Sequence, residues 1–268
     1  MKMRQAEAEK RLLDAARSLL ESGRGLTISL GSLSYEEVIR EARVPRSTAY
    51  RIWDTKQKFE DAFLADLASP EGNYYGVDTT AELLAEAYRS FGPVAADDHV
   101  RRRARVEELA NAGAQVNLEE VMQNPNWTVY AAIVTTSESS TVEGLLGSLQ
   151  TGEERFIDRM AGFYEIVCRL LGLRLRPSRE WRQLAVAGAA YIEGLALRRF
   201  LMPDALSETL KGDGQDWTLA GLGFVGLIDQ FVEEDPDWEI LPDDQVDSLI
   251  ADLKSRGTWL RPKSPIGT

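Results

Sequence analysis

Apolar residues recur at helical spacing in the first part of the chain. They define one face of a predicted helix at residues 5–22, at offsets i, i+1, i+4, i+7 and i+8: Leu12, Leu13, Ala16, Leu19 and Leu20. Gly23 follows where a left-handed cap would end this helix. Residues 26–33 alternate between apolar and polar types instead, a pattern compatible with an ordered loop or with a short β-ribbon.

Local signals then define three further helices. Ser34 and Glu37 have the spacing of a capping box, in which each side chain can bond the other residue's backbone amide. Pro45 disfavours a helical conformation at the residue before it and suits the start of a new helix. Asp54 and Thr55 supply the next cap. These signals predict helices at residues 35–42, 46–53 and 56–68.

A segment with proline and glycine, residues 69–73, predicts a domain boundary. Further helices are predicted at residues 79–91, 98–116, 126–137, 142–172, 178–201, 217–234 and 243–256. β-branched residues make 126–137 the weakest of these predictions. The expected fold class is all-α, with an N-terminal three-helix domain at residues 1–68, a larger helical domain at 74–256 and a mobile tail at 257–268.

Composition places the chain among soluble globular proteins. It has 268 residues, of which 44% are hydrophobic and 28% are charged. No run approaches the 18 or so apolar residues of a membrane helix, and the N-terminus is charged and amphipathic, so we expect a cytoplasmic protein without a membrane partner. A single cysteine and a single histidine exclude an internal disulfide and most zinc sites, and we expect no metal or cofactor.

Charge is distributed unevenly along the chain. The formal net charge is −12, which alone would suggest a poor nucleic-acid binder. Residues 1–58, however, carry 12 basic and 8 acidic residues, so this segment is positive and the remainder carries a net −16. The asymmetry predicts a small basic module joined to a larger acidic body.

The predicted helix at 46–53 follows a short helix and a tight turn, which makes the pair a helix-turn-helix candidate. It carries side chains that suit DNA, with a lysine just beyond its end: Arg46, Ser47, Thr48, Tyr50, Arg51 and Lys56. Arginine can bond guanine through two hydrogen bonds in the major groove, whereas hydroxyl and ammonium groups reach phosphates. The alternative is that the aromatic residues belong to the core and the arginines to a solvated face.

Residues 44–59 resemble the recognition-helix signature of TetR-family transcriptional regulators. That signature reads roughly V-S-x-[GS]-T-[LI]-Y-x-[HY]-F-x-[SN]-K-E-x-L, and this chain matches it at Val44, Ser47, Thr48, Tyr50, Lys56 and, with an aromatic residue, Trp53. The resemblance covers about residues 5–68. The chain departs from the family where Arg43 replaces the usual turn glycine, where Pro45 replaces the usual serine cap, and where Ile52 replaces histidine or tyrosine.

The resemblance implies roles for individual residues. Arg46, Ser47 and Arg51 would face base edges. Thr48, Tyr50 and Lys56 would contact the DNA backbone, and Ser34 could bond a phosphate. The family implies a homodimeric, ligand-responsive repressor that binds a palindromic operator and is not an enzyme.

The larger domain would bind an effector and form the dimer. Segments 178–201 and 217–234 combine apolar and small residues, which suits close packing of two helices against their symmetry mates. The alternative is that these helices are buried within one chain. The effector would be an apolar or amphipathic small molecule held by an aromatic lining, although each of these residues could equally belong to an ordinary core: Trp127, Tyr130, Met160, Phe163, Tyr164, Trp181 and Tyr191.

Other motifs favour structural interpretations. Residues 221–226 spell G-x-G-x-x-G, but the segment before them resembles a capped helix start, so we interpret the glycines as helix-packing positions. The arginine cluster at 101–105 could hold an anionic effector, but its spacing favours helical ion pairs with neighbouring acids, such as Arg103 with Glu107. Cys168 lies among apolar residues, which favours a buried, inert thiol. No catalytic constellation is present. The rival functions are a small-molecule-binding protein or enzyme with a vestigial helix-turn-helix, and a dimeric adaptor.

Overall fold

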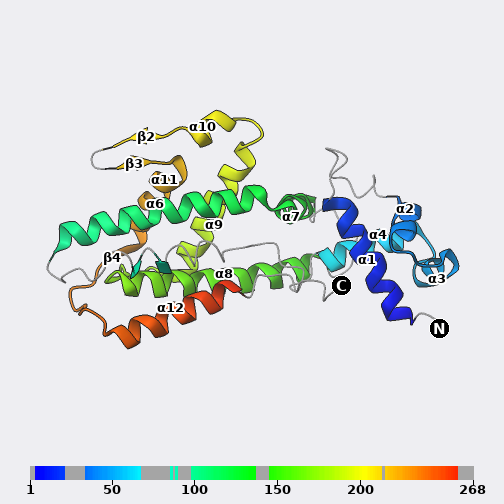
Figure 1. Cartoon of the computed structure of the whole chain (residues 1–268), viewed down its shortest axis with the longest axis horizontal. Helices are drawn as coiled ribbons and strands as arrows, with labels where there is room; N and C mark the ends of the chain where they lie inside the picture. Colours follow the sequence, from blue (N-terminus) through cyan, green and yellow to red (C-terminus); the bar gives the residue numbers. More distant parts are fainter. Residues whose placement is uncertain are drawn as a thin grey trace. The chain divides into compact units, whose positions relative to one another are not determined.

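The computed structural model describes residues 4–21, 34–67, 85–86, 88–89, 98–136, 145–212 and 215–258. The described residues are mostly helical, as the sequence predicted (Figure 1). The chain divides into two compact units. One contains residues 1–74 and 125–153, and the other contains residues 75–124 and 154–268. The predicted ribbon or loop at 24–33 and the predicted boundary at 69–73 lie outside the described residues.

The first unit contains short helices whose bounds follow the local signals closely. They are α1 (Gln5–Glu21), α2 (Tyr35–Glu41), α3 (Arg46–Ile52), α4 (Lys56–Leu67) and α7 (Pro125–Thr136). Helix α8 (Leu145–Leu170) begins in this unit and continues into the second. Each of the first four ends within one residue of its predicted end, because caps and turn residues lie next to each other in the sequence and need no tertiary information.

Aromatic side chains form the centre of the core of α1–α4. Phe59 and Phe63 are completely buried, and their rings stack with centroids 5.9 Å apart. Tyr35 stacks on the other side of Phe59 at 4.6 Å, and Trp53 meets the Phe59 ring edge-on at 5.6 Å. Leu12 of α1 is also completely buried. Phe59 therefore joins side chains from α2, α4 and the end of α3.

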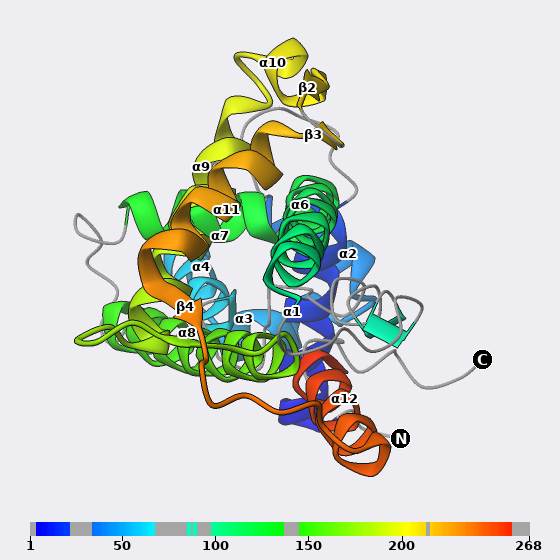
Figure 2. The same ribbon diagram turned by 90° about the vertical axis from the view of Figure 1, so that its left-hand side faces the viewer.

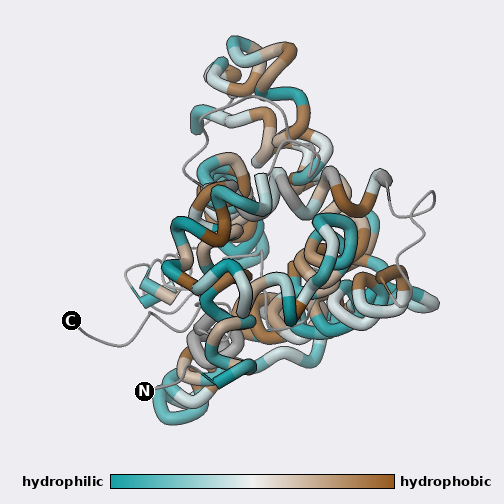
Figure 3. Tube along the Cα trace, turned by 90° about the vertical axis from the view of Figure 1, so that its right-hand side faces the viewer, coloured by the Kyte–Doolittle hydropathy of each residue, from teal (hydrophilic) through white to brown (hydrophobic). Residues whose placement is uncertain are grey.

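The second unit is built on long helices. They are α6 (His99–Gln123), the remainder of α8, α9 (Trp181–Arg198), α11 (Leu219–Phe231) and α12 (Asp243–Thr258). Helix α11 packs against both α6 and α9, and the three lie side by side (Figure 2). Hydrophilic and hydrophobic residues are interspersed along the chain (Figure 3). Ile250 anchors α12 in the core of the second unit. Of the helix predicted at 79–91, residues 85–86 and 88–89 are described, and they are helical.

Two small ribbons and one short helix were not predicted. Strand β1 (Leu173–Leu175) pairs antiparallel with β4 (Val232–Glu234), and β2 (Leu210–Lys211) pairs with β3 (Asp216–Trp217). Helix α10 (Pro203–Ser207) precedes β2. The helices predicted at 178–201 and 217–234 were therefore too long at both ends. The chain leaves α11 at Phe231 because the next three residues pair with a strand far away in the sequence.

Candidate nucleic-acid interface and ligand cavity

The turn between α2 and α3 contains a residue in the left-handed region of backbone conformation. Arg43 has φ of 51°, at the position where the sequence predicted that a side chain replaces the usual glycine. A non-glycine residue in this region carries strain, so the surrounding contacts must fix the turn. Two backbone bonds do so: Arg43 N donates to Arg40 O at 3.2 Å, and Val44 N donates to Ile39 O at 3.3 Å.

Tyr35 fixes α3 against α2. Its buried hydroxyl lies 3.0 Å from the carbonyl oxygen of Ala49 and 3.3 Å from that of Trp53, and it donates its hydrogen to this pair. Burial raises the pKa of Tyr35 to about 12, and the nearby Tyr50 and Glu36 act in the same direction. The hydroxyl therefore remains a donor throughout the physiological pH range.

The anchored helix α3 presents polar side chains to solvent. Arg46, Ser47 and Arg51 are exposed, whereas Tyr50 is half-buried and Ala49 is fully buried on the opposite side. Ser47, Tyr50 and Arg51 follow Arg46 by one, four and five residues, so all four side chains lie on one face of α3. Among the other predicted DNA contacts, Thr48 is half-buried, Lys56 is exposed at the start of α4, and the Ser34 hydroxyl caps α2 by accepting from Glu37 N at 3.4 Å.

Acidic neighbours compensate much of the positive charge of residues 43–58. Three cations of this segment form ion pairs: Arg46 with Glu36 at 2.7 Å, Lys56 with Glu60 at 3.1 Å and Lys58 with Asp54 at 2.8 Å. Arg43 and Arg51 form no ion pair within the part of the chain that the structure describes. The contact of Glu36 with Arg46 was not predicted, because it depends on how the turn folds.

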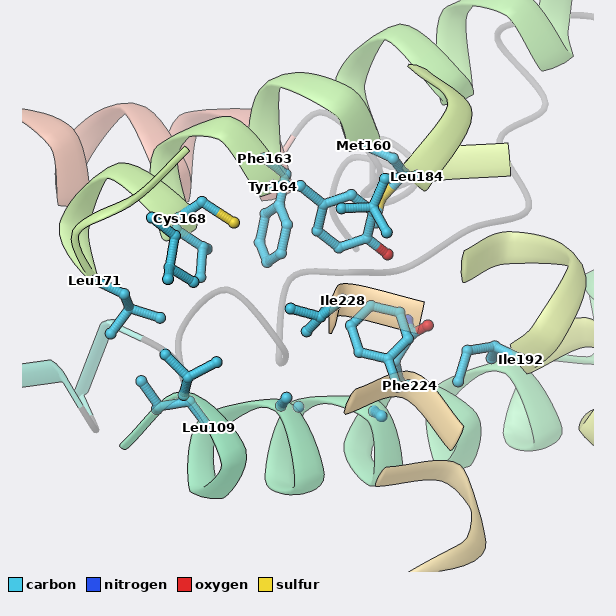
Figure 4. Close-up of a pocket in the computed structure, with 17 residues that line it drawn as sticks. Leu109, Met160, Phe163, Tyr164, Cys168, Leu171, Leu184, Ile192, Phe224 and Ile228 are labelled. Carbon is cyan, nitrogen blue, oxygen red and sulfur yellow. The ribbon is translucent and has the colours of Figure 1, made fainter. Parts of the chain in front are cut away.

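An apolar cavity lies in the second unit, enclosed by α6, α8, α9 and α11 (Figure 4). Its volume is about 70 Å³. An engineered apolar cavity that binds benzene is roughly twice as large, at about 150 Å³. No charged side chain contributes to the lining, and its polar side chains are Asn117, Tyr164 and Cys168. The cavity thus suits a compact uncharged molecule, and a larger ligand would require the lining to move.

The structure brings three of the seven predicted ligand contacts together in this cavity: Met160, Phe163 and Tyr164. Trp127 is buried in the first unit, where the Tyr130 hydroxyl also donates to Glu153 at 2.8 Å. Trp181 packs at the edge of the second unit's core, and the Tyr191 hydroxyl donates to Leu219 O at 2.6 Å. These four residues therefore lie outside the cavity.

Aliphatic residues form much of the cavity wall and were not predicted. They include Leu109, Leu184 and Ile192, with Phe224 and Ile228 of α11 beside them. Sequence periodicity marks such residues only as core positions. The sequence does not show which core residues leave an unfilled space, because this depends on how four helices that are distant in the sequence pack together.

The arginine cluster of α6 differs from its predicted pairing in part. Arg103 pairs with Glu107 at 2.6 Å, as predicted, and also contacts Asp229. Arg102 is buried instead: its guanidinium donates to Gly172 O at 2.5 Å and stacks 4.8 Å above the Trp238 ring. The cluster thus serves the packing of the second unit.

Cys168 lines the cavity and provides a test of how deeply its lining is buried. The thiol is buried, and burial raises its pKa to about 12. Because only the thiolate reacts, alkylation at pH 8 should be on the order of a thousandfold slower than for a free cysteine with a pKa of about 8.5, and the rate should rise tenfold per pH unit. Mass spectrometry of samples quenched over time would measure this rate. Equal rates in the native protein and in denaturant would contradict the burial of the thiol.

Apolar side chains are exposed on α9 and α11. Val186, Leu197 and Leu222 have about half of their surface accessible, at 54%, 48% and 46%. The two helices run antiparallel, since Arg179 Nε donates to Gln230 O and Tyr191 donates to Leu219 O at opposite ends. Phe200, Leu201 and Met202 extend the exposed apolar surface beyond the end of α9.

Comparisons with known proteins found no match to this chain among family models, curated proteins or solved structures. Within the described residues, no helix has both the length and the apolar character needed to cross a membrane. The same residues contain no group of three or more histidine, cysteine, aspartate or glutamate side chains placed to hold a metal ion. The anchored helix α3 and the apolar cavity are therefore the features of the structure that bear on function.

Proposed function

We propose that the protein is a TetR-like, DNA-binding transcriptional regulator that acts as a homodimeric, ligand-responsive repressor. The observation that carries this proposal is the arrangement of α2 and α3. A short helix is held across another by the buried Tyr35 hydroxyl, and Arg46, Ser47 and Arg51 face outward from it. A helix-turn-helix reads DNA with such a face, because the second helix enters the major groove while its partner holds it in place.

Two further observations support the dimer and the effector. The exposed apolar side chains of α9 and α11 offer a surface that a second copy could cover through a two-fold four-helix contact. The uncharged cavity offers a site for a small apolar effector. An effector that binds one conformation more tightly would shift the population, and the spacing of the two α3 helices would then no longer fit successive major grooves.

The direct test is selection of random double-stranded DNA by the purified protein near physiological salt. A homodimer that reads sequence should enrich a palindrome whose half-sites lie about 34 Å, or one helical turn, apart. A folded protein that enriches no sequence, with or without a library of small apolar compounds, would overturn the proposal. The cavity would then point to a small-molecule-binding protein that has retained a vestigial helix-turn-helix.

Arg51 and Lys56 should separate base reading from phosphate binding. Arg51→Ala is expected to lower affinity for the selected palindrome by about 5- to 150-fold and to relax preference at one base pair per half-site, because a bidentate arginine contact is lost. Lys56→Ala should weaken binding to all sequences similarly. Titrations with the palindrome, single-base variants and unrelated DNA would measure both. Identical behaviour of the two variants would contradict these roles.

A further inference from the structure

Glu36 is an exposed acidic residue at the start of α2 that contacts two of the side chains proposed to bind DNA. Its Oε1 atom forms an ion pair with Arg46 Nη2 at 2.7 Å and accepts a hydrogen bond from the Tyr50 hydroxyl, also at 2.7 Å. The Arg46 guanidinium also lies 5.5 Å from the centroid of the Tyr50 ring. One carboxylate oxygen therefore orders both side chains across the turn that joins α2 to α3.

The ion pair with Glu36 leaves the Arg46 side chain accessible to solvent. The side chains of Arg46 and Glu36 are 71% and 49% exposed, so solvent and salt screen their attraction. Such an exposed pair contributes little to folding stability. The main consequence of Glu36 is therefore a change in the charge and the geometry of the surface that α3 presents.

We propose that Glu36 determines the specificity of the DNA-binding surface by suppressing binding to unrelated DNA and by orienting Arg46 toward a base edge. This inference rests on the proposed function. Binding to unrelated DNA comes from neutralised phosphates, and a carboxylate bonded to Arg46 removes one cation from that attraction. Recognition of a base instead depends on hydrogen-bond geometry, which an ordered guanidinium satisfies better.

The guanidinium of Arg46 can keep its ion pair with Glu36 while it reads a base. Arginine has five N–H donors in a planar fork, so a contact through Nη2 leaves donors for the O6 and N7 atoms of guanine. The Tyr50 hydroxyl is committed to the same carboxylate, which limits its use on phosphates. Arg43, which forms no ion pair among the described residues, remains to attract the DNA backbone.

Glu36→Gln tests the inference, with Glu37→Gln as the matched control. Both variants remove one negative charge from the first turn of α2, but Glu37 contacts Arg40 at 3.4 Å and does not contact Arg46. For Glu36→Gln, affinity for random DNA should rise, and log K should fall more steeply with log salt, by about 0.9 per freed cation. The affinity for the selected palindrome should not rise in parallel. The ratio of the affinity for the palindrome to the affinity for random DNA should therefore fall about tenfold. Glu37→Gln should keep the wild-type ratio.

The outcomes separate this inference from the proposed function. If the wild type selects a palindrome and Glu36→Gln keeps its ratio and salt slope, only the role of Glu36 is overturned. If both glutamine variants raise affinity for random DNA and for the palindrome equally, the effect is one of net charge and the inference also fails. If neither the wild type nor either variant binds DNA, the proposed function itself fails.

Discussion

Replacing Phe59 with alanine is expected to cost the first unit about 3–5 kcal/mol of its free energy of unfolding. The ring is completely buried, and it contacts Tyr35, Trp53 and Phe63 at centroid distances of 4.6, 5.6 and 5.9 Å. Because a domain is typically stable by only about 5–15 kcal/mol, a loss of this size would leave α1–α4 close to unfolding. DNA binding should be lost with it, since Tyr35 would lose the ring that supports its hold on α3.

Phe200→Ala is the matched control for this prediction. It makes the same chemical change at a side chain of the second unit that is 61% exposed, so its effect on the free energy of unfolding of the first unit should remain within about 0.5 kcal/mol. Urea unfolding followed by circular dichroism would measure both variants. Equal effects of the two substitutions would show that Phe59 does not occupy the centre of a packed core.

Replacing Gly221 with alanine is expected to destabilise the second unit by about 1–3 kcal/mol or more. An added Cβ would lie 1.9 Å from Asn111 Oδ1 and 2.6 Å from Asn111 Cα. The side chain could turn aside, but the backbone atom could not, so α6 and α11 would have to separate. Turning the side chain also breaks the bonds that Asn111 Oδ1 accepts from the amide and the hydroxyl of Thr218, each at 3.1 Å.

Gly226→Ala on the same helix is expected to stabilise the second unit slightly. Nothing lies within 4 Å of an added Cβ there, so only the better helix propensity of alanine should act, by up to about 1 kcal/mol. Thermal unfolding at one fixed protein concentration would compare the variants, with a shift of about 2–4 °C per kcal/mol. Shifts of the same sign and size would contradict the close approach of α11 to α6.

Local signals in the sequence were enough to specify some helices of the fold. The capped start before the glycine motif predicts a helix, and Thr218 does cap α11. Gly221 and Gly223 are packing positions, as expected, whereas Gly226 has no close neighbour among the described residues. The bounds of α2 were equally accessible, since Ser34 caps the helix through the amide of Glu37. Signals of this kind act over three or four residues and are complete within the printed sequence.

Long-range pairing was not accessible in the same way. Strand β1 meets β4 although Leu175 and Val232 are distant in the sequence, and three residues give too little alternation to mark a strand. The aromatic residues proposed for the ligand site were chosen for their chemistry, whereas the cavity depends on where aliphatic side chains fail to fill space. The contact of Glu36 with Arg46 likewise depends on the turn at Arg43, whose left-handed conformation brings the two residues together.

The exposed apolar residues at the end of α9 bear on the colloidal behaviour of the protein. Phe200, Leu201 and Met202 are 61%, 78% and 56% exposed, which favours self-association. At pH 7 a net charge of −12 opposes it, because like-charged molecules repel one another in solution. Acidification toward the isoelectric point of about 4.8 removes that repulsion and leaves the apolar attraction in place. We therefore expect these side chains to be compatible with solubility in neutral buffer and to promote precipitation near pH 4.8.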